Sequence, residues 1–141
     1  MTVAESVKNW LGECPSLNGR IDVDYLDDET DTYSIDTVPC EEVIKRYLDG
    51  STLKQFQFVV ASRREYEQNI SQNLSNLEVF ADLTAWVEQK SRAKAFPVMD
   101  NNRTVQKIVV TSTAYPFVIS EDGKARYQIQ MRLEYFEKRS V

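Results

Sequence analysis

The densest group of potential metal ligands in the sequence is a run of carboxylates. Its members are Asp22, Asp24, Asp27, Asp28, Glu29 and Asp31. Hard cations such as Ca²⁺ prefer oxygen ligands of this kind, and the EF-hand loop is their best-defined sequence pattern. A loop starting at Asp22 departs from that pattern, because Leu26 occupies its fifth position and Asp27 stands where glycine is required. We therefore interpret the run as a solvated acidic tip, with a cation site as the alternative.

The chain contains no histidine, which is the commonest general acid or base and the commonest metal ligand near neutral pH. Its absence excludes serine–histidine and cysteine–histidine nucleophiles and most zinc sites. No serine, lysine or tyrosine stands in a known catalytic motif, and the 4 glycines form no phosphate-binding loop. The sequence therefore predicts a protein that is not an enzyme and that uses no cofactor and no metal.

The most regular polar pattern lies near the C-terminus. Apolar and polar residues alternate from residue 125 to residue 135, which is typical of a strand with one buried and one solvated face. The polar positions include Arg126, Gln128, Gln130 and Arg132. This face is interpreted as either a plain wet surface or a surface for assembly. The candidate assembly residues are Asp27, Asp28, Asp31, Arg126, Gln128, Gln130 and Arg132.

The first half of the chain predicts one helix and four strands. Thr2 and Glu5 have capping-box spacing ahead of an amphipathic helix over residues 3–12. Alternating segments at 21–25 and 33–38 flank the acidic tip, so we expect them to form a hairpin. The dipeptide Asp49-Gly50 predicts a second hairpin, in which a strand ends before it and a long strand follows to about residue 62.

The second half predicts a long helix and further strands. Ser75 and Glu78 have capping-box spacing ahead of a helix that ends near Arg92, while residues 66–73 are ambiguous. A strand is expected over 105–115, with Pro116 marking a break or an edge. The predicted fold class is α+β, with an antiparallel or mixed β-sheet packed on one face by helices.

Length and charge narrow the class of protein further. The 141 residues are enough for one domain with a real hydrophobic core, so we expect a single domain over 1–141. The net charge of −5 argues against nucleic acid as a direct partner. No apolar stretch is long enough to span a membrane and no export signal is visible. Cys14 and Cys40 lack metal-binding spacing, so we expect two reduced thiols, with a disulfide as the alternative.

Several segments together resemble a known protein family. They are YSI at 33–35, IKRYLDGS at 44–51, QFVVASR at 57–63 and ARYQIQ at 125–130, joined by WL at 10–11 and VQKI at 105–108. Their order and spacing resemble the small minor capsid or tail-completion proteins of bacteriophages and prophages of Gram-positive bacteria. The likeness runs over most of the chain.

This resemblance implies a structural virion component with a fold similar to tail terminators. Such proteins are expected to form a ring, commonly of six copies, that caps the tail tube and joins it to the head-side connector. The implied location is the virion, assembled in the cytoplasm of the host bacterium. The alternative is a non-enzymatic adaptor that acts as a monomer or dimer and binds another protein through a sheet edge.

Overall fold

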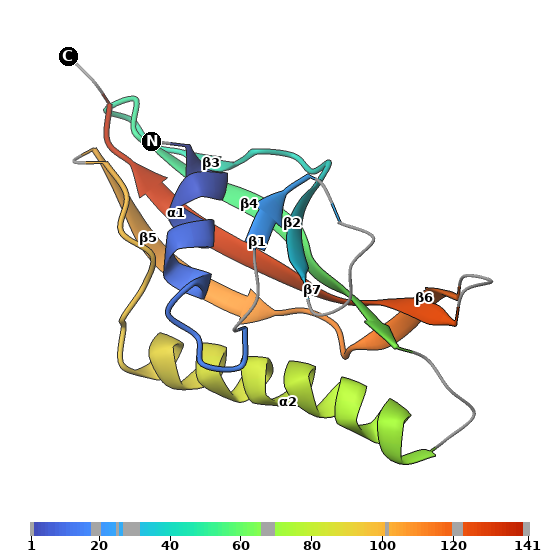
Figure 1. The fold of residues 1–141 in the computed structure, drawn as a ribbon. Coiled ribbons are helices and arrows are strands. Elements are labelled where there is room, and N and C mark those ends of the chain that lie inside the picture. The colour runs from blue at the N-terminus through green and yellow to red at the C-terminus, as the bar shows by residue number, and fades with distance from the viewer. Residues whose placement is uncertain are drawn as a thin grey trace.

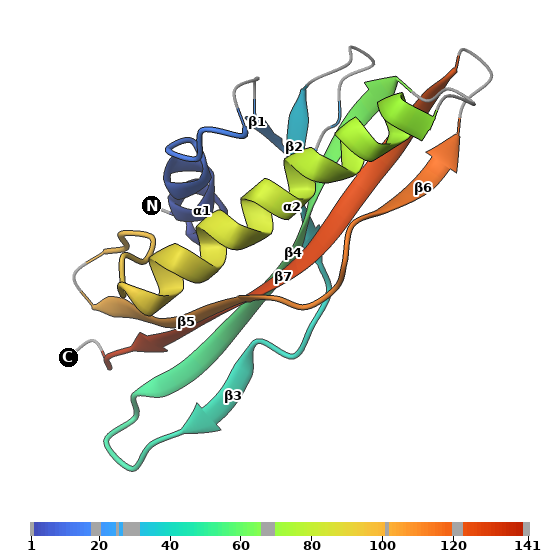
Figure 2. The same ribbon diagram turned by 90° about the horizontal axis from the view of Figure 1, so that it is seen from below.

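The computed structural model describes residues 2–17, 21–24, 26, 32–65, 70–100, 102–119 and 123–139. Two helices pack on one face of a seven-stranded mixed sheet, as Figures 1 and 2 show from two directions. The predicted α+β class, with a sheet covered on one face by helices, is confirmed.

Nine elements follow one another in the described part of the chain. They are α1 (Val3–Leu11), β1 (Ile21–Val23), β2 (Tyr33–Val38), β3 (Val43–Arg46), β4 (Thr52–Glu65), α2 (Ile70–Arg92), β5 (Arg103–Val110), β6 (Tyr115–Ile119) and β7 (Lys124–Glu137).

The centre of the sheet is the antiparallel pair β4 and β7, each 14 residues long. The strand order is β1-β2-β4-β7-β5, with β3 also on β4 and β6 also on β7. Each long strand is therefore flanked by two short ones, and all pairs except β1 with β2 are antiparallel. Figure 2 shows that β3 and the start of β4 extend past the body of the molecule as a hairpin.

The hydrophobic core lies between the helices and one face of the sheet. Its sheet side is the predicted apolar series of the last strand, all at most 4% exposed: Ala125, Tyr127, Ile129, Met131, Leu133 and Tyr135. Phe58 and Val60 of β4 lie on the same face and are fully buried. From the helix side come Val7 and Leu11 of α1 and Phe80, Leu83 and Val87 of α2.

The short helix α1 is capped at its N-terminus by its own sequence and is anchored near its C-terminus by Trp10. The Thr2 side chain accepts a hydrogen bond from the backbone N–H of Glu5 at 3.1 Å, as the capping-box spacing predicts. Its buried face includes Trp10, whose ring lies 4.7 Å from that of Trp86 on α2. The indole N–H of Trp10 donates to the carbonyl of Ala95 at 2.8 Å, which satisfies the polar atom of a buried ring.

The predicted hairpin of the first two strands is wrong. β1 pairs parallel to β2, with Ile21 opposite Tyr33 and Val23 opposite Ile35. Asp24 ends β1 in a left-handed conformation, with φ +54°, and so turns the chain out of the strand. Alternating polarity has the same period in parallel and antiparallel strands, so the sequence pattern could not separate the two arrangements.

Two other boundaries differ from those expected. The helix α2 starts at Ile70, so Ser75 lies inside it and is not its N-terminal cap. The strand expected over 105–115 is two strands, because the chain leaves the sheet between Val110 and Tyr115. Both pieces pair with β7, and Pro116 lies in β6, where no further strand pairs on the outer side in the described part of the sheet. The predicted hairpin around Asp49-Gly50 is confirmed as β3 and β4.

Candidate assembly face

The sheet face opposite the helices carries most of the candidate residues that the sequence singles out. We call it the helix-free face. By strand register its members at the centre of the sheet are Ser34 and Asp36 of β2, Gln55, Gln57, Val59 and Ala61 of β4, and Arg126, Gln128, Gln130 and Arg132 of β7. The face is amide-rich, and four of these ten side chains are glutamines.

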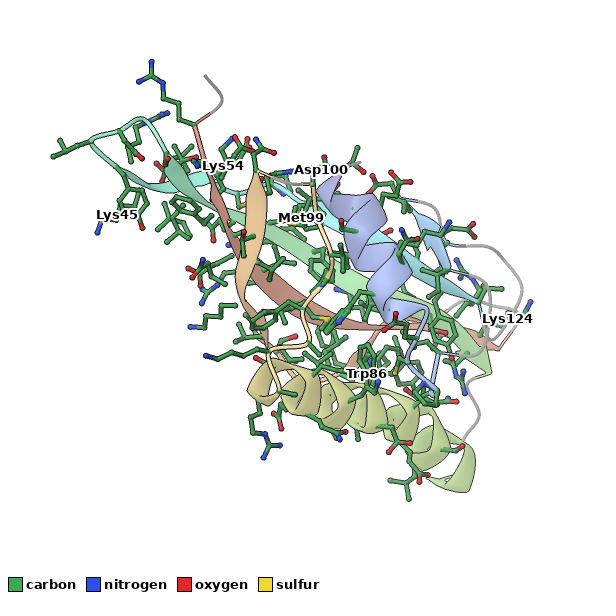
Figure 3. The ribbon with its side chains drawn as sticks, turned by 90° about the vertical axis from the view of Figure 1, so that its left-hand side faces the viewer. Lys45, Lys54, Trp86, Met99, Asp100 and Lys124 are labelled. Carbon is green, nitrogen blue, oxygen red and sulfur yellow. The ribbon has the colours of Figure 1, made fainter. Side chains whose placement is uncertain are left out.

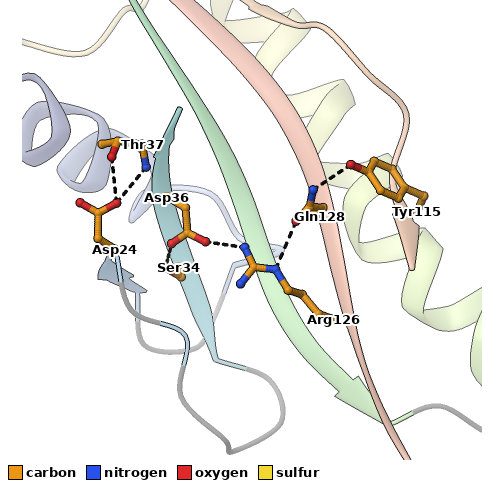
Figure 4. A network of polar contacts seen from close by, with 7 residues as sticks. All are labelled: Asp24, Ser34, Asp36, Thr37, Tyr115, Arg126 and Gln128. Atoms are coloured by element: carbon orange, nitrogen blue, oxygen red, sulfur yellow. Dashed lines mark hydrogen bonds and ion pairs between the residues drawn. The ribbon is translucent and has the colours of Figure 1, made fainter. Parts of the chain in front are cut away.

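A chain of polar contacts crosses this face from β2 to β6 (Figure 4). Ser34 Oγ donates to Asp36 Oδ1 at 2.5 Å, and the other carboxylate oxygen of Asp36 forms an ion pair with Arg126. Arg126 Nε donates to Gln128 Oε1 at 3.2 Å. Gln128 Nε2 in turn donates to the Tyr115 hydroxyl at 2.7 Å.

The ion pair of this network bridges two strands that are not neighbours. Asp36 lies on β2 and Arg126 on β7, with β4 between them. The arginine side chain must therefore lie across β4, where Ala61 is small enough to leave room and is 0% exposed. Both partners expose 22% of their side chains, so water screens the pair only partly. The contact acts as a strap across the centre of the sheet.

The remaining candidates on this face differ in environment. Gln130 is exposed, whereas Gln128 is only 8% exposed because it belongs to the network. Arg132 lies 3.6 Å from Glu134, and its Nε atom is buried with no hydrogen-bond partner among the described residues. The prediction that these alternate positions are all wet is wrong for Gln128, since the neighbouring polar side chains bury it.

The acidic candidates Asp27, Asp28 and Asp31 lie outside the described residues, so their role in assembly stays a prediction. Of the same run, Asp24 is described, and its Oδ1 accepts from the Thr37 backbone N–H at 2.9 Å and from Thr37 Oγ1 at 3.1 Å. That carboxylate fastens the end of β1 to β2. Among the described residues, no group of three or more His, Cys, Asp or Glu is arranged to hold a metal ion.

The hairpin of β3 and β4 has a closely fixed tip. The Asp49 carboxylate accepts from the Ser51 backbone N–H at 2.9 Å and from Ser51 Oγ at 3.1 Å. These hydrogen bonds to the charged form lower the pKa of Asp49 below its ordinary value of 3.8. From the C-terminal segment, the backbone N–H of Arg139 donates to Ser51 Oγ at 3.1 Å. Leu48 nevertheless stands fully exposed at this tip.

A second ionic contact lies near the base of the same hairpin. Lys54 Nζ is 2.9 Å from Glu137 and 3.4 Å from Glu42. The hydrogen bond to Glu137 raises the pKa of Lys54 above its ordinary value of 10.5. The two carboxylates, one just before β3 and one at the end of β7, hold the ammonium of β4, so this contact is structural.

A cavity beside the two helices gathers few reactive groups. A cavity of about 460 Å³ lies between the segment after α1 and the outer side of α2. Its lining is Cys14, Pro15, Ser16, Asp82, Ala85, Trp86 and Gln89. Asp82 is its one carboxylate and is exposed. Cys14 is buried with Sγ 3.1 Å from Ser16 Oγ, Cys40 is exposed, and both are free thiols.

No protein-family model matches the chain, and no curated protein matches it either. Within the described residues, neither helix has the length and apolar character needed to cross a membrane.

Sequence reasoning missed several members of the polar network. Ser34 and Asp36 belong to β2, which is distant in the sequence from β7, and only the strand order brings them near Arg126. Tyr115 belongs to β6, which directly precedes β7 and pairs with it. The sequence held one signal for this pair: Ser34 and Asp36 are two residues apart in an alternating strand. The spacing that places both on one side of β2 could have marked them as a polar pair.

Proposed function

We propose that this chain is a structural component of a bacteriophage particle, of the minor capsid or tail-completion kind and similar to tail terminators. It assembles at the head–tail junction as a ring of its own copies. In this role it contacts the tail tube and the head-side connector, and it acts without catalysis. Its location is the virion, which is assembled in the cytoplasm of the host bacterium.

The observation that carries the proposal is the helix-free face with its internal polar strap. The ion pair of Asp36 and Arg126 fixes the centre of the sheet, while Gln130 remains available on the surface. A polar sheet face of this kind suits contacts between subunits, which are richer in polar groups than a core. The resemblance of most of the sequence to minor capsid or tail-completion proteins is the reason for proposing this particular assembly.

The carboxylates of the described site also support a non-catalytic role. Asp24, Asp36 and Asp49 each accept hydrogen bonds from groups of the same chain. A general acid or base needs a free proton-binding position directed at a substrate. These three groups instead connect strands and turns.

The test uses a phage or prophage that encodes this chain. Removing its gene should leave heads and tails that fail to join, or tails of irregular length, in electron micrographs of the lysate. Restoring the gene in trans should restore complete particles, which should contain the protein by mass spectrometry. Normal particles without the gene product would overturn the proposal.

An adaptor that acts as a monomer or dimer is the second candidate. The exposed Leu48 at a well-fixed hairpin tip favours it, because burial of an exposed apolar side chain against a partner protein is favourable. Native mass spectrometry over a range of concentrations separates the two candidates. A discrete larger oligomer favours the ring, and a dimer that persists at high concentration favours the adaptor.

A further inference from the structure

Two strands on opposite sides of the sheet have an open outer edge in the described part of the chain. β3 pairs only with β4, and β5 pairs only with β7. Figure 3 looks toward the second edge, where β5 lies in front of the long strands and Met99 and Asp100 mark the entry to it. An open edge presents unpaired backbone N–H and C=O groups that can bind a further strand.

The register of the sheet places the two edge strands at the same position along the strand direction. One row of paired residues runs from Arg46 of β3 through Thr52 and Glu137 to Arg103 of β5. β3 is antiparallel to β4, whereas β5 is parallel to β4 because both are antiparallel to β7. If two copies stand side by side in the same orientation, β3 of one therefore meets β5 of the next as an antiparallel pair.

One pair of opposite charges faces across the two edges in this arrangement. The Glu41 carbonyl accepts from the side chain of Gln55 at 2.7 Å, so Glu41 lies beside the row that ends at Lys107 of β5. At the other end of the edge, Arg46 lies in the row of Arg103, whose partner Asp100 exposes 46% of its side chain. Reading both edges in the antiparallel sense thus sets Glu41 against Lys107 at one end. At the other end Arg46 meets Arg103 together with Asp100, with which Arg103 forms an ion pair.

Glu41 and Lys107 are also available for such a contact. Both are exposed, and neither side chain has an ion pair or hydrogen bond with another residue that the structure describes. They lie at opposite edges of the sheet, separated by three strand spacings of roughly 4.8 Å each. An attraction between these two side chains must therefore come from two different copies.

Exposed apolar side chains accompany both edges. Ile44 sits in the β-bulge of β3 and is 45% exposed, and Leu48 lies just beyond this strand. On the other side, Val98 is 79% exposed in the segment that leads into β5. Burial of such side chains between copies would add apolar area to the backbone pairing.

We propose that β3 of one copy binds the β5 edge of the next copy as an antiparallel strand, with Glu41 facing Lys107. The contact joins two different surfaces, so it repeats head to tail and closes into a ring when the rotation permits. This inference rests on the proposed ring-forming function and names the surfaces that form the ring. The partner is a second copy of the chain because the complementary charges lie on its own two edges.

Charge reversal tests the pairing directly. The wild type, Glu41→Lys, Lys107→Glu and an equimolar mixture of the two variants are compared by analytical ultracentrifugation. Each variant alone sets like charges against each other, so its self-association should weaken about fivefold or more relative to wild type. In the mixture every lysine at 41 can meet a glutamate at 107, so association should return to the wild-type level. Glu78→Lys, on the exposed side of α2, is the control for the change in net charge that Glu41→Lys makes.

The outcomes separate this inference from the proposed function. If the wild type forms oligomers and both variants associate as strongly as it does, the edge pairing is overturned while the ring stands. If each variant associates more weakly than the wild type and mixing the two does not restore association, Glu41 does not face Lys107 and the pairing is also overturned. A wild type that stays monomeric throughout would overturn the edge pairing, whereas the proposed function is decided by the particle experiment with the gene removed.

Discussion

At the scale of single residues, the ion pair of Asp36 and Arg126 is the contact on the helix-free face whose loss should lower the unfolding free energy most. Replacing Arg126 with Ala leaves a largely buried carboxylate without its cation. Such a loss costs about 1–3 kcal/mol of unfolding free energy. Urea denaturation of R126A should show this decrease.

The matching control is Arg132→Ala, because Arg132 is more exposed and lies 3.6 Å from Glu134. A loss below about 1 kcal/mol is expected there. The double variant of Asp36→Ala and Arg126→Ala should lose less stability than the two single losses combined, since neither partner is then left alone. Additive losses would mean that the strap is not a coupled pair.

The Asp49 carboxylate gives a second test at this scale, through pH. Its pKa is lowered in the folded state by the hydrogen bonds from Ser51. Its contribution to stability is therefore fully present above the unfolded value near 3.8, and it is lost as the pH falls through the lower folded value. An NMR titration of the Asp49 carboxyl group should give a midpoint below 3.8, and Ser51→Ala should move it upward. An unchanged midpoint in S51A would contradict the assignment to Ser51.

At the scale of elements, the β3–β4 hairpin depends on the backbone of Gly50. Its φ of +91° is strained for any residue with a Cβ atom, and that atom would lie 2.6 Å from the Arg139 side chain. Gly50→Ala should therefore lower the unfolding free energy by about 1–2 kcal/mol. Thermal denaturation by circular dichroism measures the change.

Gly12→Ala provides the comparison for this backbone effect. Gly12 follows α1 with φ −61°, and an added Cβ would meet the carbonyl of Asn9 at an ordinary 3.4 Å. This variant should change stability by less than about 1 kcal/mol. If both variants lose the same amount, the cause at Gly50 is not its left-handed conformation.

The elements also show how far sequence reasoning reached. Local signals located α1 through the Thr2 cap, the hairpin at Asp49-Gly50 and the buried face of β7 correctly. They failed where pairing between separate segments decides the arrangement of the strands, as in the parallel pairing of β1 with β2. Strand order is set by contacts across the whole sheet, and no residue pattern within one strand records it. For the same reason the sequence found Arg126 but not its partner Asp36.

At the scale of the whole molecule, we predict that the acidic run around residue 27 acts in assembly through long-range charge. Reversing Asp27, Asp28 and Asp31 to Lys should leave the fold intact, because such tips contribute little to a core. Self-association should nevertheless weaken if the run faces a basic surface of a neighbouring copy, since complementary charges steer and hold subunits. The weakening should diminish in high salt. Sedimentation velocity and circular dichroism of the triple variant test both parts.

A change in net charge alone could produce the same weakening, because the whole molecule carries −5. The control is a triple reversal of Glu78, Asp82 and Glu88, which are exposed on the outer side of α2 and change the net charge equally. Weakening in the first variant and not in the second would assign the effect to the position of the acidic run. Equal weakening in both would reduce it to general electrostatic repulsion, and unchanged assembly in the first would remove the run from the contact surface.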